Sequence, residues 1–280
     1  MIIARTIESL NTARATLGPL ALVPTMGALH AGHLSLVAAA RESGLPVAVS
    51  IFVNPLQFGP NEDFARYPRD EVADLAMLRE AGCALAWLPD LAAMYPPGDA
   101  TVIEVAGPAQ RWEGSARPGH FRGVATVVAK LFGQTRPERA YFGEKDWQQV
   151  QVVSRMARDL ALPVTIITVP TLRDADGLAL SSRNRYLAAE ERRRAAMLPA
   201  TLRDVQAKIQ AGALDETAIT AALGQARVQL HDHGFGIDYL ALVDAHSLEP
   251  LARATPASRL LVAVRLGSVR LLDTMPAQSE

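Results

Sequence analysis

Cysteine is nearly absent from this chain of 280 residues, in which Cys83 is the only one. A single cysteine cannot form an internal disulfide, which excludes a disulfide-stabilised secreted domain, and we expect Cys83 to be a buried structural thiol. No apolar run reaches the length that a transmembrane helix requires. The first residues, Met1–Ser9, lack the ordered charged, apolar and cleavage regions of a signal peptide, so we expect a cytoplasmic protein.

The chain also lacks an excess of charge of either sign. Its 28 Lys and Arg against 29 Asp and Glu give a formal net charge of −1. This balance provides no electrostatic attraction for nucleic acid or an anionic membrane, and we expect neither as a partner. The hydrophobic content of 49% and the charged content of 20% are typical of a globular protein with a sizeable core. The length is enough for one large α/β domain or for one and a half domains.

Short apolar runs alternate with amphipathic segments through the first part of the chain. The runs predict strands, and apolar residues three and four apart predict helices. The strands are predicted at residues 20–24, 47–53, 84–88 and 164–169, with another ending at Tyr141-Phe142; the helices are predicted at 7–17, 71–81 and 147–160, with others ending near Arg41 and Phe132. This alternation predicts an α/β fold with a Rossmann-like, doubly wound parallel sheet.

The pattern changes after about Thr171. Two polar helices, at about 188–211 and 215–232, precede predicted strands at 237–243, 259–264 and 269–273, and the last two strands are joined by a short turn. This order predicts a smaller C-terminal α+β domain, so we expect domains at 1–171 and 172–280. We expect the tail at 276–280 to be disordered.

The turn Pro24–His33, PTMGALHAGH, lies between a predicted strand and a predicted helix. Free backbone N–H groups and the helix dipole make such a turn an anion site. His30 and His33 are three residues apart and can face the same ligand, whereas the glycine patterns of a dehydrogenase or P-loop turn are missing. A histidine hydrogen-bonded to the backbone of its own loop is the alternative, and neighbouring carboxylates or cysteines at metal-ligand spacing are lacking.

A second polar loop, Asn54–Gly59, follows the second strong strand. Ligands bind beyond the carboxyl ends of strands in an open parallel sheet, so this loop should lie beside the histidine turn. The amides of Asn54 and Gln57 suit recognition of a hydroxyl or carboxylate on a small polar substrate. Ordinary turn chemistry is the alternative, and it suits Pro55 better than Gln57.

Three further segments carry groups that suit anions. Lys145, at another strand-to-helix turn, could neutralise a phosphate, although Asp146 and Gln149 also form a capping box. Ser181, Ser182 and Arg183 form an array of donors, and the turn Asp176-Gly177 before them suggests a lid; a helix cap with a surface arginine is the alternative. The charges of the loop 112–123, at Glu113, Arg117 and His120, fit either a solvated loop or a ligand contact.

Five motifs in fixed order resemble the pantoate–β-alanine ligase (pantothenate synthetase) family of the nucleotidylyltransferase superfamily. They are PTMGALHAGH at 24–33, SIFVNPLQF at 50–58, RPGHFRGV at 117–124, FGEKDWQQ at 142–149 and DGLALSSRN at 176–184. The resemblance extends to LG at 266–267 and RLLD at 270–273. Leu56, Trp147 and Leu172 depart from the usual residues but keep apolar bulk.

The resemblance implies a carbon–nitrogen ligase that makes a precursor of coenzyme A. Pantoate attacks the α-phosphorus of ATP to give pantoyl adenylate and pyrophosphate, and β-alanine then displaces AMP to give pantothenate. Mg²⁺ on the ATP phosphates and a homodimer are also implied, as are the small-molecule substrates ATP, (R)-pantoate and β-alanine.

By the same resemblance His30, His33, Lys145 and Arg183 are the catalytic residues, with His33 commonly assigned the acid role. Pantoate is implied at Gln57 and Gln149, and β-alanine at Gln57. The implied nucleotide contacts are Met26, Gly27, Ala28, Leu29, His30, Ala31, Gly32, His33, Gly143, Glu144, Lys145, Asp146, Leu172, Leu180, Ser181, Ser182 and Arg183.

Three other functions use parts of this pattern. An aminoacyl-tRNA synthetase would need a tRNA-binding module and a basic face, which this chain lacks. A nucleotidylyltransferase that stops at nucleotide transfer is closer, but the two glutamines favour a small hydroxy-acid substrate. A non-catalytic nucleotide sensor would have no reason to retain His30, His33, Lys145 and Arg183 together.

Overall fold

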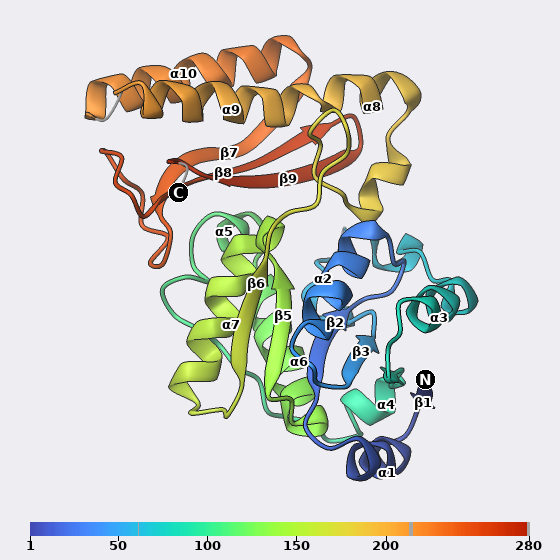
Figure 1. Cartoon of the computed structure of the whole chain (residues 1–280). Coiled ribbons are helices and arrows are strands. Elements are labelled where there is room, and N and C mark those ends of the chain that lie inside the picture. Colours follow the sequence, from blue (N-terminus) through green and yellow to red (C-terminus); the bar gives the residue numbers. More distant parts are fainter. Residues whose placement is uncertain (61, 213–214, 279–280) are drawn as a thin grey trace. The chain divides into compact units, whose positions relative to one another are not determined.

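The computed structural model describes residues 1–60, 62–212 and 215–278. Its internal contacts divide the chain into two compact units (Figure 1). The first unit comprises Met1–Glu144 and Gln148–Pro170, and the second comprises Lys145–Trp147 and Thr171–Glu280. The binding of nucleotide and pantoate by residues 1–171, and the role of residues 172–280 as a lid, stay predictions.

The first unit is built on a parallel sheet of six strands in the order β1-β4-β3-β2-β5-β6. Its strands are β1 (Ile2–Ala4), β2 (Ala21–Thr25), β3 (Val47–Ile51), β4 (Leu85–Trp87), β5 (Arg139–Gly143) and β6 (Thr165–Val169). From β2 the chain proceeds outward to β3 and β4, and later returns to β5 on the other side of β2. This reversal confirms the doubly wound sheet, and it places the topological switch point between β2 and β5, where α/β folds of this kind bind ligands.

Helices cover both faces of this sheet because successive strand residues point to opposite sides. Leu20 and Leu22 pack into one core with α1, α6 and α7, whereas Ala21 and Val23 pack into another with α2 and α3. The helices are α1 (Ile7–Leu17), α2 (Ala31–Arg41), α3 (Glu71–Glu80), α4 (Leu91–Met94), α5 (Glu113–Ala116), α6 (His120–Thr135) and α7 (Trp147–Asp159). Three 3-10 turns are interspersed: η1 (Pro55–Gln57), η2 (Asp63–Arg66) and η3 (Glu144–Asp146).

The second unit is an α+β layer structure, as predicted. Its antiparallel sheet has the order β7-β8-β9, and α9 and α10 lie along one face of it (Figure 1). Leu266 pairs with Val269 across Gly267-Ser268, where the sequence predicts a short turn. The elements are η4 (Ser182–Tyr186), α8 (Ala189–Ala195), α9 (Met197–Gln210), α10 (Glu216–Asp232), β7 (Phe235–Asp244), β8 (Ser258–Leu266) and β9 (Val269–Pro276).

Two local predictions are wrong, and one strand was missed. The helix expected over 188–211 is broken at Ala196 into α8 and α9, because the ring of Pro199 excludes a helical hydrogen bond to the carbonyl of Ala195. Strand β1 was not predicted, since three residues are too few to show a pattern. The tail is ordered where it pairs: Pro276 ends β9, and the N–H of Ala277 donates to the carbonyl of Ser258 at 2.9 Å. Positions 279–280 lie outside the described residues.

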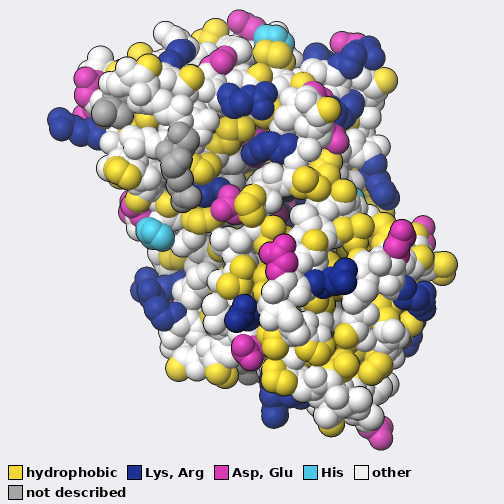
Figure 2. Space-filling model, viewed as in Figure 1, with side chains coloured by type: hydrophobic (Ala, Val, Ile, Leu, Met, Phe, Trp, Pro, Cys, Tyr) yellow, Lys and Arg dark blue, Asp and Glu magenta, His cyan; other side chains and the backbone are white. Residues whose placement is uncertain are grey.

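Surface charge and the single thiol agree with the composition. Lys and Arg are interspersed with Asp and Glu over the visible surface (Figure 2). Cys83 is buried as predicted, and burial raises the pKa of its thiol to about 11. Within the described residues, every helix falls short of the length and apolar character that crossing a membrane requires.

Candidate active site

The histidine turn leaves the carboxyl end of β2, next to the switch point of the sheet. Gly27 (φ 79°) and Ala28 (φ 50°) both have left-handed backbone conformations. A Cβ atom on Gly27 would lie 2.9 Å from Oδ2 of Asp74 and 3.1 Å from Cγ2 of Ile51. Glycine is therefore required at Gly27 by conformation and by space.

Asp74 on α3 holds this turn, and the motifs did not reveal it. Its carboxylate accepts the N–H of Ala28 at 2.9 Å and that of Leu29 at 2.8 Å, while its side chain is only 2% exposed. A buried carboxylate that accepts two backbone N–H bonds is strongly tied to its partners. The available signal was its position, one turn before Leu78 on the buried face of an amphipathic helix.

The two histidines lie together at the start of α2. Their ring centroids are 4.2 Å apart. His30 is the N-cap of α2, and its Nδ1 accepts the N–H of Gly32 at 3.1 Å. Because Nδ1 accepts this bond, a neutral His30 ring carries its proton on Nε2 and can donate it to an oxygen of a ligand. The backbone-bonded alternative for His30 is thus correct for its Nδ1 atom.

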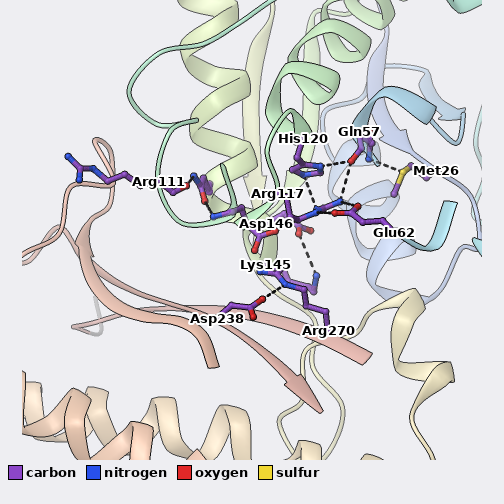
Figure 3. A network of polar contacts seen from close by, with 12 residues as sticks. Met26, Gln57, Glu62, Arg111, Arg117, His120, Lys145, Asp146, Asp238 and Arg270 are labelled. Carbon is purple, nitrogen blue, oxygen red and sulfur yellow. Dashed lines mark hydrogen bonds and ion pairs between the residues drawn. The ribbon is translucent and has the colours of Figure 1, made fainter. Parts of the chain in front are cut away.

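Gln57 lies beside the histidine turn. Its Nε2 donates to Sδ of Met26 at 2.9 Å, a contact drawn in Figure 3, and its side chain is buried. Nδ2 of Asn54 donates to Oε1 of Gln57 at 3.2 Å. Because Nε2 carries two N–H groups and the thioether is a weak acceptor, the amide can offer an N–H group to an incoming oxygen.

Asn54 itself has a structural role. It is 1% exposed, and its Oδ1 accepts the N–H of Leu56 at 3.2 Å and the hydroxyl of Tyr95 at 2.8 Å. Its Nδ2 donates to the carbonyl of Gly123 at 3.1 Å as well as to Gln57. The turn-chemistry interpretation therefore holds for Asn54, and the substrate-facing interpretation is restricted to Gln57.

The two glutamines at the start of α7 differ in surroundings. Gln148 is buried and holds the loop before α5: its Oε1 accepts the N–H of Glu113 at 3.0 Å, and its Nε2 donates to the carbonyls of Pro108 and Arg111, each at 2.8 Å. Gln149, the residue predicted for pantoate, is only half-buried. Its amide is the more accessible of the pair.

The charged loop residues gather around the main chain of Gln57 (Figure 3). Nδ1 of His120 lies 2.8 Å from the Gln57 carbonyl oxygen, and Nη2 of Arg117 donates to the same oxygen at 3.2 Å. Arg117 also forms ion pairs with Glu62 at 2.6 Å and with Glu113 at 3.5 Å. The charges of the loop 112–123 are thus held by contacts within the first unit.

Strand β5 contributes its end to the same edge of the sheet. It pairs with β2, and a Cβ atom on Gly143 would lie 3.9 Å from Cδ2 of Leu36 on α2. Gly143 and Glu144 are the predicted nucleotide residues of this strand end, and both belong to the first unit.

Lys145, Asp146 and Trp147 belong to the second unit by their contacts. The indole N–H of Trp147 donates to the carbonyl of Ala245 at 2.7 Å, and the guanidinium of Arg259 lies 3.9 Å from the centre of its ring. Phenylalanine could not make this hydrogen bond. Nζ of Lys145 lies 3.5 Å from Oδ1 of Asp146.

Two of the remaining nucleotide candidates, Leu172 and Leu180, lie on one hairpin in the second unit. The N–H of Leu180 donates to the carbonyl of Leu172 at 3.0 Å, and the turn between them closes at Gly177. Arg192 binds Asp174 and Asp176, which fixes this hairpin to α8.

The serine–arginine segment follows the hairpin directly. Oγ of Ser181 accepts the N–H of Arg183 at 3.3 Å, so Ser181 caps η4. The structure thus brings Leu172 and Leu180 together, as it does Ser181 and Arg183.

Similarity to known proteins covers almost the whole chain. A sequence model of the family described as Pantoate-beta-alanine ligase matches residues 2–276. A pantothenate synthetase of Acidiphilium cryptum is 61% identical over 280 residues, covering 98% of this chain and 99% of that protein. One of Rhizorhabdus wittichii is 54% identical over 283 residues, covering 99% of each.

Two crystal structures with the same fold also resemble this chain. Pantothenate synthetase from Thermus thermophilus matches with a TM-score of 0.94 and 47% identity, over 100% of both chains. Pantoate-beta-alanine ligase from Francisella tularensis, complexed with beta-gamma ATP and beta-alanine, matches with a TM-score of 0.82 and 33% identity, over 99% of this chain and 98% of that one.

Proposed function

This chain belongs to the pantoate–β-alanine ligase family, and we propose how its residues carry out the family reaction. The protein is an ATP-dependent carbon–nitrogen ligase that condenses (R)-pantoate with β-alanine to give pantothenate, a precursor of coenzyme A. The observation that supports our assignment best is the contact between Gln57 and Met26, because it puts an amide donor beside the histidine turn.

In the first step a pantoate carboxylate oxygen attacks the α-phosphorus of ATP. The new oxygen–phosphorus bond forms as the bond to the pyrophosphate oxygen breaks, and negative charge develops on the leaving group. This negative charge is stabilised by hydrogen-bond donors and positive charge from His30, His33, Lys145 and Arg183. The Nε2–H of His30 is one such donor, since Nδ1 accepts the N–H of Gly32.

In the second step the amine of β-alanine attacks the activated carbonyl. A carbon–nitrogen bond forms, the bond from the carbonyl carbon to the AMP oxygen breaks, and the amine loses a proton. The amides of Gln57 and Gln149 hold pantoate, and Gln57 also contacts β-alanine. The Francisella tularensis relative was crystallised with β-alanine, which supports a β-alanine site in this chain.

The nucleotide contacts come from three segments. Met26–His33 provides the turn, Gly143–Asp146 the strand end, and Leu172 with Leu180–Arg183 the hairpin and its donors. Backbone N–H groups and side-chain hydroxyls of this kind suit phosphate oxygens.

ATP enters as its magnesium complex, since phosphate oxygens are ligands that Mg²⁺ prefers. We further propose a cytoplasmic homodimer. A single cysteine, which cannot form an internal disulfide, suits a reducing compartment. Analytical ultracentrifugation of the purified enzyme tests the dimer.

Isotope exchange between ATP and pyrophosphate, with pantoate present and β-alanine absent, tests the proposal. Exchange that requires pantoate supports the adenylate step. Pyrophosphate release with a different acid or nucleotide partner would instead assign a sister transferase, and silence under every condition would favour a nucleotide sensor.

A further inference from the structure

We infer that Arg117 and His120 are positioning residues for the substrate acid, because they hold the main-chain carbonyl of Gln57 and with it the amide that faces pantoate. This inference rests on the proposed binding of pantoate by Gln57. Neither residue belongs to the nucleotide or pantoate contacts assigned above, and both lie in the first unit with Gln57. Figure 3 shows both side chains directed toward the Gln57 main chain.

The neighbours of His120 fix its tautomer. A carbonyl oxygen only accepts, so the 2.8 Å contact to Gln57 requires a proton on Nδ1. A guanidinium only donates, so Nε2, 3.2 Å from Nη1 of Arg117, must be unprotonated. His120 is therefore neutral, donating to Gln57 and accepting from Arg117.

Arg117 is held rigidly in turn. Its Nε and Nη2 donate to the two carboxylate oxygens of Glu62 at 2.8 and 2.6 Å, a bidentate pair. The same Nη2 reaches the Gln57 carbonyl, and Nη1 faces both His120 and Glu113. The carbonyl of Gln57 thus receives two donors, which occupy both of its lone pairs.

The charges around His120 agree with a neutral ring. Burial and the positive charge of Arg117 lower its pKa to about 4, although the hydrogen bond to Gln57 and the carboxylates Glu113 and Glu62 act in the opposite direction. At neutral pH His120 therefore keeps both of its contacts, to the carbonyl of Gln57 and to Arg117. Protonation would direct a second N–H at the guanidinium and break the contact.

Helix α6 also fixes the peptide group between Leu56 and Gln57. A Cβ atom on Gly123, one turn after His120, would lie 2.2 Å from the carbonyl oxygen of Leu56 and 2.6 Å from the nitrogen of Gln57. The carbonyl of Gly123 accepts from Asn54, which in turn holds the side chain of Gln57. The first turns of α6 and the residues Arg117 and Glu62 thus determine where the Gln57 amide lies.

Substitutions at His120 separate positioning from simple packing. Asparagine can place an N–H donor where Nδ1 lies, glutamine places its amide nearer to Nε2, and alanine provides neither. We expect H120A to raise the KM for pantoate by about tenfold in the pantoate-dependent exchange assay, with the KM for ATP unchanged. We expect H120N to restore the pantoate KM to within about twofold of the wild-type value, and H120Q to behave like H120A.

The control is H231A, which removes a strongly exposed histidine in the second unit. Thermal unfolding shows which variants fold. If H120A unfolds, the ¹⁵N chemical shifts of His120 in the wild-type enzyme decide: a neutral ring with its proton on Nδ1 down to about pH 5 is expected. A proton on Nε2 would overturn the inference.

The outcomes distinguish this inference from the function it rests on. Pantoate-independent or absent exchange in the wild-type enzyme would contradict the proposed function. Normal wild-type exchange, with a folded H120N as impaired as H120A or with ATP and pantoate KM rising together, would overturn the positioning role alone.

Discussion

The carboxylate of Asp74 on α3 accepts the backbone N–H of Ala28 at 2.9 Å, across 46 positions of sequence. With the second bond, to Leu29, it supports a pair of left-handed residues immediately before the histidines. A turn with this conformation is costly by itself, and the buried carboxylate offsets that cost. The position of the histidines thus depends on a residue far outside their motif.

Replacing Asp74 with asparagine tests this dependence. The amide can accept one N–H through its oxygen but directs its own NH₂ group at the other, so one buried donor is left without an acceptor. We expect D74N to lower the free energy of unfolding by about 2 kcal/mol and to slow the pantoate-dependent exchange by about tenfold or more. Urea unfolding and exchange rates measure the two effects.

Asp70 on the same helix provides the matched control. It is the N-cap of α3, where asparagine is as favourable as aspartate, so D70N should change neither quantity appreciably. A D74N enzyme that matches D70N in both assays would show that the two hydrogen bonds accepted by the Asp74 carboxylate are dispensable.

His30 has two separable roles, capping α2 and donating from Nε2. Asparagine at this position keeps the cap but removes the second ring nitrogen. We therefore expect H30N to retain wild-type stability and H30A to lose about 1 kcal/mol. Both variants should slow adenylate formation by on the order of 10²-fold. Stopped-flow or quench-flow detection of pyrophosphate measures this step, and an active H30N would restrict His30 to its capping role.

Gln57 can present an N–H donor to the substrate because its Nε2 carries two N–H groups and donates one to the thioether of Met26. We expect Q57A to weaken pantoate binding by about tenfold while the KM for ATP stays unchanged, since the amide is assigned to pantoate and β-alanine and not to the nucleotide. Exchange assays with each substrate varied in turn give both constants. Equal loss of pantoate and ATP affinity would argue against the assigned acid pocket.

Stability should depend on pH through His120. The ring has a pKa of about 4 in the folded protein against an ordinary value of 6.5, so the unfolded chain binds the proton first as the pH falls. The free energy of unfolding should decrease between pH 6.5 and pH 4 by up to about 3 kcal/mol and should not fall further through this group at lower pH.

The H120N variant, which also tests positioning, isolates the contribution of His120 to this pH dependence of stability. H120N does not titrate, whereas Glu62, Glu113 and the other carboxylates titrate in both proteins. Urea unfolding of both at pH 7 and pH 4.5 should show the smaller decrease in H120N. Equal decreases would mean that the ring is not held neutral.

The sheet and most helices could be predicted because each carries a local signal. The alternation that sends Leu22 to one core and Val23 to the other is visible in the chain itself, and glycine, proline and the caps mark the ends. The break at Ala196 was also predictable, since Pro199 stands inside the expected helix.

The supports of the site could not be predicted in the same way. Asp74 reaches the histidine turn, and Tyr95 reaches Asn54, through contacts between segments more than 40 positions apart in both cases. Such contacts depend on how strands are ordered in the sheet, which composition and periodicity do not specify. The sequence marks Arg117 and His120 as loop charges and as part of the RPGHFRGV motif, but it does not reveal their role, because their partner is a backbone carbonyl that has no signature of its own.

Gly123 limits which substitutions the enzyme can accept at this position. Its absent side chain leaves room for the Leu56 carbonyl, whereas Gly133, later in the same helix, has nothing within 4 Å of where a Cβ would lie. Consider a library randomised at both codons and grown in cells that need this gene to make their vitamin. At codon 133, selection should enrich alanine and other helix formers. At codon 123, only glycine should survive selection.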